Sequence, residues 1–351
     1  MNNIVTYALE LNHDLFTLGV DDQPMPIFDT HCHLDRIFMK LHGTRIADFY
    51  DQKRFMENFD NGPFEVLRKI PGLIPNPVPY SGCLHVITSP HFFDKTFWDW
   101  LTLEPNVYLA LGCHPQDSMK MEEKDFLNLE NSMLHPKVVA LGEIGLDEVW
   151  EERGICMDIQ KSIFKRQVQL AIKMQKPMIL HLRGFKAMID ATIILEEEKV
   201  PKHWPIHLHA FTYSYDFCKK FEEEYSGMKF GMVANKFDLD VVTNLPLSKI
   251  LLETDGPYFF PMELGTHGVS VPNYISSVAK EIAYIKGIEL FDVLVANVNN
   301  AYDLYKIPCP PSDLFHKSEK SNFEISQWQP VRNFEGGKVL KYVAFRNFYA
   351  S

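Results

Sequence analysis

Short apolar runs recur through most of the chain and predict the strands of a buried sheet. The first run ends in Ile27 and Phe28 and is expected as a strand over 26–30. Further strands are expected at 83–87, 107–112, 138–142, 177–181, 205–209, 229–233 and 250–255. These runs are nearly continuous rather than alternating, which is typical of strands covered on both faces.

Segments with helical spacing separate most of the apolar runs. The segment 158–175 is the strongest, because residues such as Phe164 and Val168 fall on one face. Further helices are expected at 92–103, 122–133, 184–198, 215–225, 274–285 and 290–305. Alternating strands and helices predict a (β/α)8 barrel of the TIM type, with a doubly wound open sheet as the alternative. No Gly-x-Gly-x-x-Gly follows the first strand, so no dinucleotide site is indicated.

Two segments before the second strand do not follow this alternation. Residues 1–25 are polar and irregular and are expected as an N-terminal extension. Residues 36–80 are expected as a long connection without regular structure, because prolines are dense in it. A connection of this length is usually functional.

The C-terminal segment 306–351 also lies outside the barrel pattern. It is rich in aromatic residues, which a disordered tail could not bury, so we expect it to be ordered and packed on the barrel. Within it, 339–345 is expected as a strand after a Gly336-Gly337 turn. Its net charge is positive, so it either covers apolar helix faces or brings basic residues to a phosphate-bearing ligand.

Composition narrows the class of protein. With 46% hydrophobic and 23% charged residues, the chain is expected to be soluble, with neither a membrane span nor a secretory signal. Its 6 cysteines are scattered without a Cys-x-x-Cys pair, which favours a cytoplasmic or nuclear location and excludes a Cys-rich zinc module. The net charge of −11 means that a nucleic acid would have to bind through locally grouped Lys and Arg. The oligomeric state is not indicated.

The first predicted strand ends in two histidines. His31 and His33 are two residues apart, so they project from the same face of a strand. Two imidazoles side by side form half of a metal site. The alternative is a pair of unrelated polar residues where a strand ends.

Other strand ends carry residues of the same chemical type. Catalytic residues of a barrel lie at the carboxyl ends of its strands. The residues expected there are His31, His33, His114, Glu143, His181, His209 and Asp255, with Arg183 just beyond His181. Each one alone could be structural, but their coincidence predicts a metal site.

This set is larger than the three ligands of a catalytic zinc and suits two ions bridged by one carboxylate. Glu143 is the expected bridge, because it lies between the two histidine sets. A metal ion lowers the pKa of its bound water enough to form hydroxide near pH 7. Asp255 is expected as a ligand, as the base that orients this water, or as both.

Three histidines are not expected to bind metal. His114 is expected to contact substrate, since the ligand set is already full without it. His207 lies deeper than His209 on the same strand and is expected inside the barrel rather than as a ligand. His85 ends no strand cleanly and is expected to be structural.

Six ordered motifs resemble those of the TatD-type deoxyribonuclease family of the amidohydrolase superfamily, over about residues 26–305. They are Asp29-Thr-His31-Cys-His33-Leu-Asp35, Gly112-Cys-His114-Pro115, Gly142-Glu143-Ile-Gly145-Leu-Asp147, Ile179-Leu-His181-Leu-Arg183, His209-Ala-Phe211-Thr212 and Glu253-Thr-Asp255-Gly-Pro257-Tyr258. The long connection after the first strand and the run 257–261 are most similar to the eukaryotic TatD-domain branch.

The resemblance implies a (β/α)8 barrel that hydrolyses phosphodiester bonds of DNA or RNA with one to three divalent ions. Two ions are expected, of zinc, manganese, nickel or magnesium. Carried over by position, His31, His33 and Asp255 hold one ion, His181 and His209 hold the second, and Glu143 bridges them. Arg183 and His114 then face the substrate phosphate, with Tyr258 as a further substrate contact.

This chain departs from the family pattern in one rim loop. Gly256 replaces the usual Ala or Ser, and 265–272 lacks the arginine that the family carries there. This departure puts the substrate preference in question, and two other functions are alternatives to a nuclease. The same metal ligands could serve a hydrolase of small amides, lactones or phosphoesters, and a non-catalytic scaffold could bind a partner through its tail. Extended, salt-sensitive binding of a polynucleotide would favour the nuclease.

Overall fold

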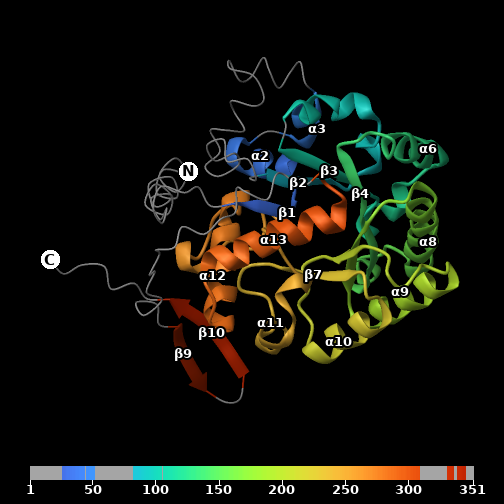
Figure 1. The fold of residues 1–351 in the computed structure, drawn as a ribbon. Helices are drawn as coiled ribbons and strands as arrows, with labels where there is room; N and C mark the ends of the chain where they lie inside the picture. The colour runs from blue at the N-terminus through green and yellow to red at the C-terminus, as the bar shows by residue number, and fades with distance from the viewer. Residues whose placement is uncertain are drawn as a thin grey trace.

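Eight parallel strands form one sheet in the order of the sequence (Figure 1). The computed structural model describes residues 26–43, 45–51, 82–104, 106–308, 330–335 and 338–344. The strands of the sheet are β1 Phe28–Cys32, β2 Gly82–Ile87, β3 Val107–Leu111, β4 Val138–Asp147, β5 Met178–Arg183, β6 Ile206–Leu208, β7 Met228–Met232 and β8 Ile250–Leu252.

The sheet closes between its first and last strands. Cys32 pairs in parallel with Gly256, just after β8, and the Asp255 backbone N–H donates to the carbonyl of His31 at 2.9 Å. The predicted barrel is therefore confirmed, and the open sheet is excluded.

Helices and short 3-10 turns connect the strands and surround the barrel (Figure 1). The helices are α2 Leu34–His42, α3 Ile46–Tyr50, α6 Glu123–Ser132, α7 Glu148–Glu152, α8 Met157–Met174, α9 Phe185–Glu197, α10 Tyr215–Glu224, α11 Leu239–Asn244, α12 Ile275–Lys286 and α13 Leu290–Tyr305. The 3-10 turns are η2 Pro90–Phe92, η3 Lys95–Phe97, η4 Asp99–Leu103, η5 Pro115–Lys120, η6 Leu247–Lys249, η7 Met262–Leu264 and η8 Pro272–Tyr274.

The expected helix over 92–103 is wrong, because three 3-10 turns occupy this segment. Its buried side chains include Phe93, Trp98 and Trp100, whose spacing does not fit one face of an α-helix. The Asp94 carboxylate instead accepts from the backbone N–H of Thr96 and starts a tight turn.

The connection expected to be irregular over 36–80 begins with helices α2 and α3. Ile37 and Phe38 are buried on one face of α2, and Gly43 ends the helix in the left-handed region with φ 65°. The expectation was wrong for this part because the dense prolines begin only after it. The proline-rich part, like residues 1–25, lies outside the described residues.

Most strand boundaries differ from the expectation by one or two residues, and those of β1, β4 and β8 bear on the site. β1 starts at Phe28 rather than at residue 26, where a proline has no N–H to donate. β4 continues to Asp147, beyond the expected end at 142. β8 stops at Leu252, and Asp255 has left the strand with a φ of 47°.

Part of the C-terminal segment forms an antiparallel hairpin of β9 Pro330–Glu335 and β10 Lys338–Ala344. The strand expected over 339–345 is thus confirmed, whereas its turn lies outside the described residues. The backbone of β10 runs close to η7, and Figure 1 shows the hairpin beside α12. Packing of the whole segment 306–351 on the barrel stays a prediction.

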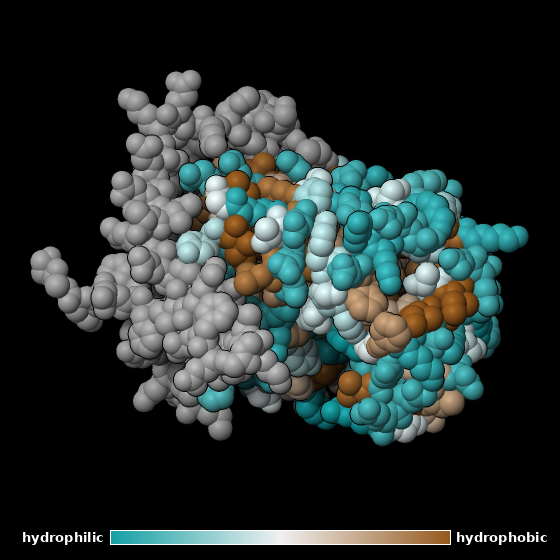
Figure 2. All heavy atoms as spheres, turned by 90° about the horizontal axis from the view of Figure 1, so that it is seen from below, coloured by the Kyte–Doolittle hydropathy of each residue, from teal (hydrophilic) through white to brown (hydrophobic). Residues whose placement is uncertain are grey.

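Helix α13 forms hydrogen bonds with both the first and the last strand of the barrel. The side-chain amide of Asn297 donates to the carbonyl of Phe28 at 2.7 Å and accepts from the backbone N–H of Leu252 at 2.8 Å. Ile307, two residues past the end of α13, is 4% exposed and joins the core cluster below the strands. On the face shown in Figure 2, hydrophilic residues predominate and hydrophobic ones form small separate groups. Among the described residues, no helix is long and apolar enough to cross a bilayer.

Candidate metal centre and active site

The carboxylate of Glu143 lies between two groups of histidines at the carboxyl ends of the strands. Its Oε2 is 3.6 Å from Nε2 of His31 and 3.9 Å from Nε2 of His33. Its Oε1 is 2.6 Å from Nδ1 of His181 and 3.5 Å from Nε2 of His209. The two oxygens of one carboxylate therefore face side chains from different sides of the barrel rim.

Asp255 brings a second carboxylate to the same cluster. Its Oδ1 is 3.4 Å from Nε2 of His33 and 3.7 Å from Nε2 of His31. Its Oδ2 is 3.7 Å from Nε2 of His209. All six residues predicted as ligands thus lie together, and each is at most 8% exposed.

A β-bulge in β4 positions Glu143. The pairing of β4 with β5 shifts by one residue between Gly142 and Ile144, so Glu143 is the extra residue. A bulge turns one side chain away from the regular alternation of the strand. Glu143 therefore points over the rim toward the histidines of β1, β5 and β6.

The cluster fits divalent cations. Most of its N···O distances, at 3.4–3.9 Å, are too long for hydrogen bonds but suit pairs of ligands that each lie about 2.0–2.2 Å from a shared ion. Both ring nitrogens of His31 are buried without a hydrogen-bond partner among the described residues, a costly state that a bound cation would relieve.

Two triplets in the cluster share Glu143. His31, His33 and Glu143 form one, and Glu143, His181 and His209 form the other, each with candidate ligand atoms within 4.8 Å of one another. A donor set of this kind can hold two cations with one common carboxylate.

Electrostatic coupling keeps the shared carboxylate charged. Burial opposes its ionisation, but the imidazoles of His209 and His181 hold the pKa of Glu143 well below its usual range. Burial also opposes charge on His31, yet Glu143 and Asp255 together raise the pKa of this imidazole to about 9. Glu143 is therefore an ionised carboxylate in a buried site, a state that would suit a cation.

Residues inside the barrel contact His209 and hold its imidazole in place. Nδ1 of His209 is 3.0 Å from Oε2 of Glu253. Nε2 of His207 is 3.1 Å from the same oxygen, and its Nδ1 is 2.6 Å from the hydroxyl of Tyr305. A Cβ on Gly231 would collide with the Glu253 carboxylate, so only glycine leaves room for this arrangement. Metal ligands commonly need such a partner on the second ring nitrogen.

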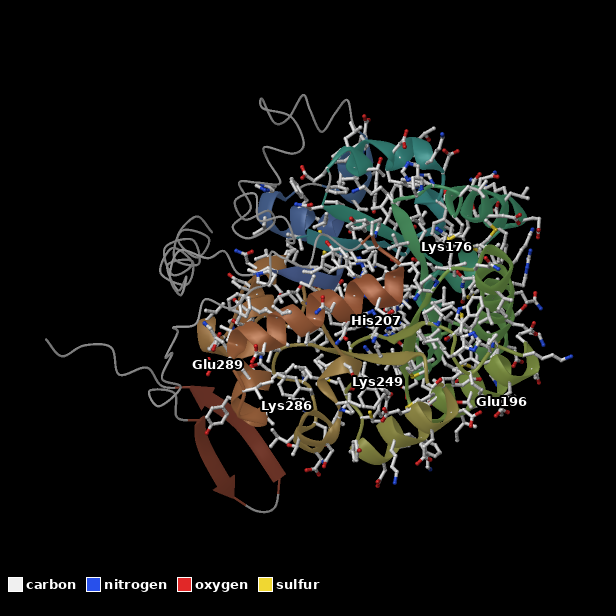
Figure 3. All side chains as sticks on the ribbon, in the orientation of Figure 1. Lys176, Glu196, His207, Lys249, Lys286 and Glu289 are labelled. Atoms are coloured by element: carbon white, nitrogen blue, oxygen red, sulfur yellow. The ribbon has the colours of Figure 1, made fainter. Side chains whose placement is uncertain are left out.

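His207 lies near the middle of the barrel and is fully buried (Figure 3). This agrees with its predicted place inside the barrel. His85 is also structural, because it accepts from the backbone N–H of Leu34 and lies 3.1 Å from the hydroxyl of Tyr50.

Asp147 holds the other nitrogen of His181. Its Oδ2 is 2.9 Å from Nε2 of His181, while its Oδ1 accepts from the backbone N–H of Val149 and caps α7. Burial and the charge of Arg183 oppose protonation of His181, but the two carboxylates that it contacts raise its pKa.

The predicted substrate contacts surround this cluster. His114 follows β3, and its Nε2 is 3.9 Å from Oε1 of Glu143 while its Nδ1 accepts from the backbone of Gln116. Arg183 ends β5, and its Nη1 donates to the carbonyl of Leu182 at 3.0 Å. His114 also forms a triplet of possible metal ligands with Asp147 and His181. Its position therefore suits either contact with the substrate or binding of a metal ion.

Tyr258 stands at the mouth of the site on the loop after β8. It is 42% exposed, and its ring centroid is 6.4 Å from that of His33. Its hydroxyl accepts from Nη1 of Arg36 at 3.2 Å. An aromatic face this open beside a metal cluster suits stacking against a flat ligand group.

Three residues at the site were not given a role from the sequence. Asp147 lies four residues past Glu143, at the end of a strand that was expected to end at residue 142. Glu253 precedes the strand-end residue that was chosen, and Arg36 lies in the connection that was expected to be irregular. The helical spacing of the apolar residues after His33 predicts a helix there. A helix that starts at this point places Arg36 near the rim.

Comparison with known proteins shows the family of this chain. The sequence profile described as TatD related DNase matches residues 28–306. The human protein named 3'-5' RNA nuclease TATDN2 is 31% identical over 287 residues, which are 80% of this chain and 35% of that protein. The present chain thus spans about a third of the length of this relative. The Bacillus subtilis protein named uncharacterized metal-dependent hydrolase YabD is 32% identical over 205 residues, 57% of this chain and 78% of YabD.

The solved structure of YjjV, a TatD homolog from Escherichia coli K12, has the same fold. It superposes with a TM-score of 0.60 at 22% identity and covers 81% of this chain and 99% of its own. The fold and the buried His and carboxylate cluster are those of a barrel suited to holding divalent cations. The chain belongs to the TatD related DNase family.

Proposed function

We propose that this protein hydrolyses phosphodiester bonds of DNA or RNA with two divalent cations. Its observed basis is the Glu143 carboxylate, whose two oxygens face His31 and His33 on one side and His181 and His209 on the other. A match to a family described as DNases and a relative named as an RNA nuclease support a nucleic-acid substrate.

The cations would be held as the family resemblance implies. His31, His33 and Asp255 would hold one and His181 with His209 the other, with Glu143 shared. The mixture of imidazole and carboxylate suits zinc, manganese, nickel or magnesium. Bound at this rim, such cations polarise a phosphoryl oxygen and ionise water near neutral pH.

The protein's own side chains perform the remaining tasks. Asp255 orients the attacking water and accepts its proton, because its two oxygens border both histidine groups. His114, Arg183 and Tyr258 contact the substrate from three sides of the cluster and fix the phosphate in line for attack. The charged guanidinium of Arg183 also stabilises the negative charge that develops on the phosphoryl oxygens.

The cysteine usage supports a cytoplasmic or nuclear location. The described cysteines are Cys32, Cys83, Cys113, Cys156 and Cys218, and none of them forms a disulfide. Reduced, mostly buried thiols are typical of these compartments.

Turnover after metal removal tests the proposed function. The purified protein is stripped with a chelator, and cleavage of single- and double-stranded DNA and RNA is measured before and after adding each of the four metals. We expect no cleavage by the stripped protein and its return with at least one metal. Hydrolysis of small amides, lactones or phosphomonoesters without any cleavage of polynucleotides would favour the rival hydrolase.

A further inference from the structure

The side chain of Arg36 lies between two loops at the rim of the site. It belongs to the first turn of α2, three residues after His33. Its Nη2 donates to the hydroxyl of Thr88 at 2.7 Å and its Nη1 to the hydroxyl of Tyr258 at 3.2 Å. These two partners follow β2 and β8, so the guanidinium is held between two rim loops of the barrel.

The positive charge of Arg36 reaches the metal cluster. Burial lowers the pKa of His33, and the charge of Arg36 lowers it further. The same charge adds to the effects of burial and of His181 in lowering the pKa of His114. The charge of Arg36 therefore acts on imidazoles of the site.

No carboxylate of the described residues forms an ion pair with the Arg36 guanidinium, and both of its side-chain partners are neutral hydroxyls. Burial opposes its charge, whereas the carboxylates of Asp35 and Glu143 raise its pKa without an ion pair. A guanidinium has five N–H donors, so several remain for a ligand. Its planar fork matches two oxygens of a phosphate group.

A second cation on α2 lies beside the same aromatic ring as Arg36. Lys40 lies one turn after Arg36, and its Nζ is 6.0 Å from the centroid of the Tyr258 ring. The guanidinium carbon of Arg36 lies 6.0 Å from the same centroid. Positive charge beside an exposed aromatic ring is the arrangement by which proteins hold single-stranded nucleic acid.

We propose that Arg36 binds an oxygen of the substrate phosphate, on the opposite side of the cluster from Arg183, and that Thr88 and Tyr258 position it. This inference rests on the proposed function and names a residue that sets where the polynucleotide lies. Arg36 also supplies a positive charge at the rim. The family resemblance predicts an arginine in the loop 265–272, which this chain lacks.

Binding to the metal-free protein tests Arg36 separately from catalysis. The anisotropy of labelled single-stranded 20-nucleotide DNA and RNA is measured in EDTA over a series of salt concentrations. We expect Arg36→Gln to weaken binding about ten-fold or more and to reduce the slope of log K against log salt by about one. Arg36→Lys keeps the charge, so its salt slope stays close to that of the unmodified protein while its affinity falls.

The matched control is Arg45→Gln, which removes an exposed arginine that pairs with Asp48. Its binding and salt slope should change much less than those of Arg36→Gln. Tyr258→Phe removes only the hydroxyl that holds Arg36, and its effect should disappear when Arg36 is already glutamine. If Arg36→Gln folds poorly, the Lys and Phe variants carry the same test.

The outcomes separate this inference from the proposed function. Equal binding and equal kcat/KM for Arg36→Gln, Arg45→Gln and the unmodified protein would overturn the role of Arg36 while cleavage itself stands. If no metal restores cleavage to the unmodified protein, the proposed function fails, and the anisotropy experiment still decides whether Arg36 binds phosphate.

Discussion

Nε2 of His31 and Oε2 of Glu143 lie 3.6 Å apart, although they come from β1 and β4, with β2 and β3 between them in the sheet. The two side chains can come this close because both lie at the carboxyl ends of the strands. The bulge in β4 directs Glu143 toward the histidines. With Glu143 also 2.6 Å from His181, one carboxylate connects the two halves of the cluster. The predictions below follow from this connection and from the residues around it.

His114→Ala should leave the metal content unchanged and lower kcat/KM. The expectation follows from Nδ1 of His114, which accepts from Gln116 and leaves Nε2 directed at the cluster without joining either Glu143 triplet. Elemental analysis of the variant, together with kinetics, decides its role. Loss of one metal equivalent would instead make His114 a ligand in the triplet with Asp147 and His181.

Glu253→Gln should reduce metal affinity by about 10–100-fold, because the carboxylate that orients His209 through Nδ1 is lost. Competition with a chelator measures the change. Glu130→Gln, on the exposed side of α6 where it pairs with Lys173, is the control and should bind metal normally. Equal affinities for the two variants would show that Glu253 does not support the ligand.

Glu281→Gln should stabilise the protein at high pH. Burial and the nearby charge of Glu263 raise the pKa of Glu281 to about 8 from an ordinary value of 4.5. The folded state thus keeps a proton that the unfolded state releases, so stability falls as pH rises from about 4.5 to 8. Denaturant unfolding should show a gain for the variant that grows from pH 4.5 to pH 8 and reaches about 4 kcal/mol, since each pKa unit corresponds to about 1.4 kcal/mol.

Glu196→Gln, which replaces an exposed carboxylate at the end of α9, is the control for the substitution itself. A constant difference for Glu281→Gln would mean that Glu281 is charged in the folded protein at neutral pH.

Removal of residues 309–351 tests the predicted packing of the C-terminal segment. The deletion begins after Ile307, which belongs to the barrel core and has to be kept. If the segment covers the barrel, thermal unfolding moves to lower temperature or the protein becomes insoluble. Weaker and less salt-dependent binding of polynucleotide by a stable truncation would support a role in substrate contact. Unchanged stability and binding would refute both.

The barrel and most of its rim were predictable because the necessary information is local. Apolar runs of strand length mark each strand, and His31 with His33 share a face through the two-residue period. Glu143 and Asp255 follow from reading the polar residue at each strand end. The predicted (β/α)8 fold holds because strand order and closure follow from these repeats.

The parts that were missed depend on contacts between distant segments. Glu253 acquires its place from the space left by Gly231 on the neighbouring strand, which no local pattern encodes. Arg36 is directed inward by Thr88 and Tyr258, from two other loops. The 3-10 turns over 90–103 form because buried aromatic side chains such as Trp98 select the backbone, against the helical propensity of the segment.

Metal content and turnover of Glu143→Gln, measured on the same preparation, test the two-cation proposal most directly. A neutral amide cannot serve as a shared anionic ligand, so we expect the occupancy of both metal positions to fall and cleavage of DNA and RNA to be lost. Thermal unfolding in EDTA should still show a folded protein. A variant that retains two metal equivalents and cleaves at the rate of the unmodified protein would contradict the account.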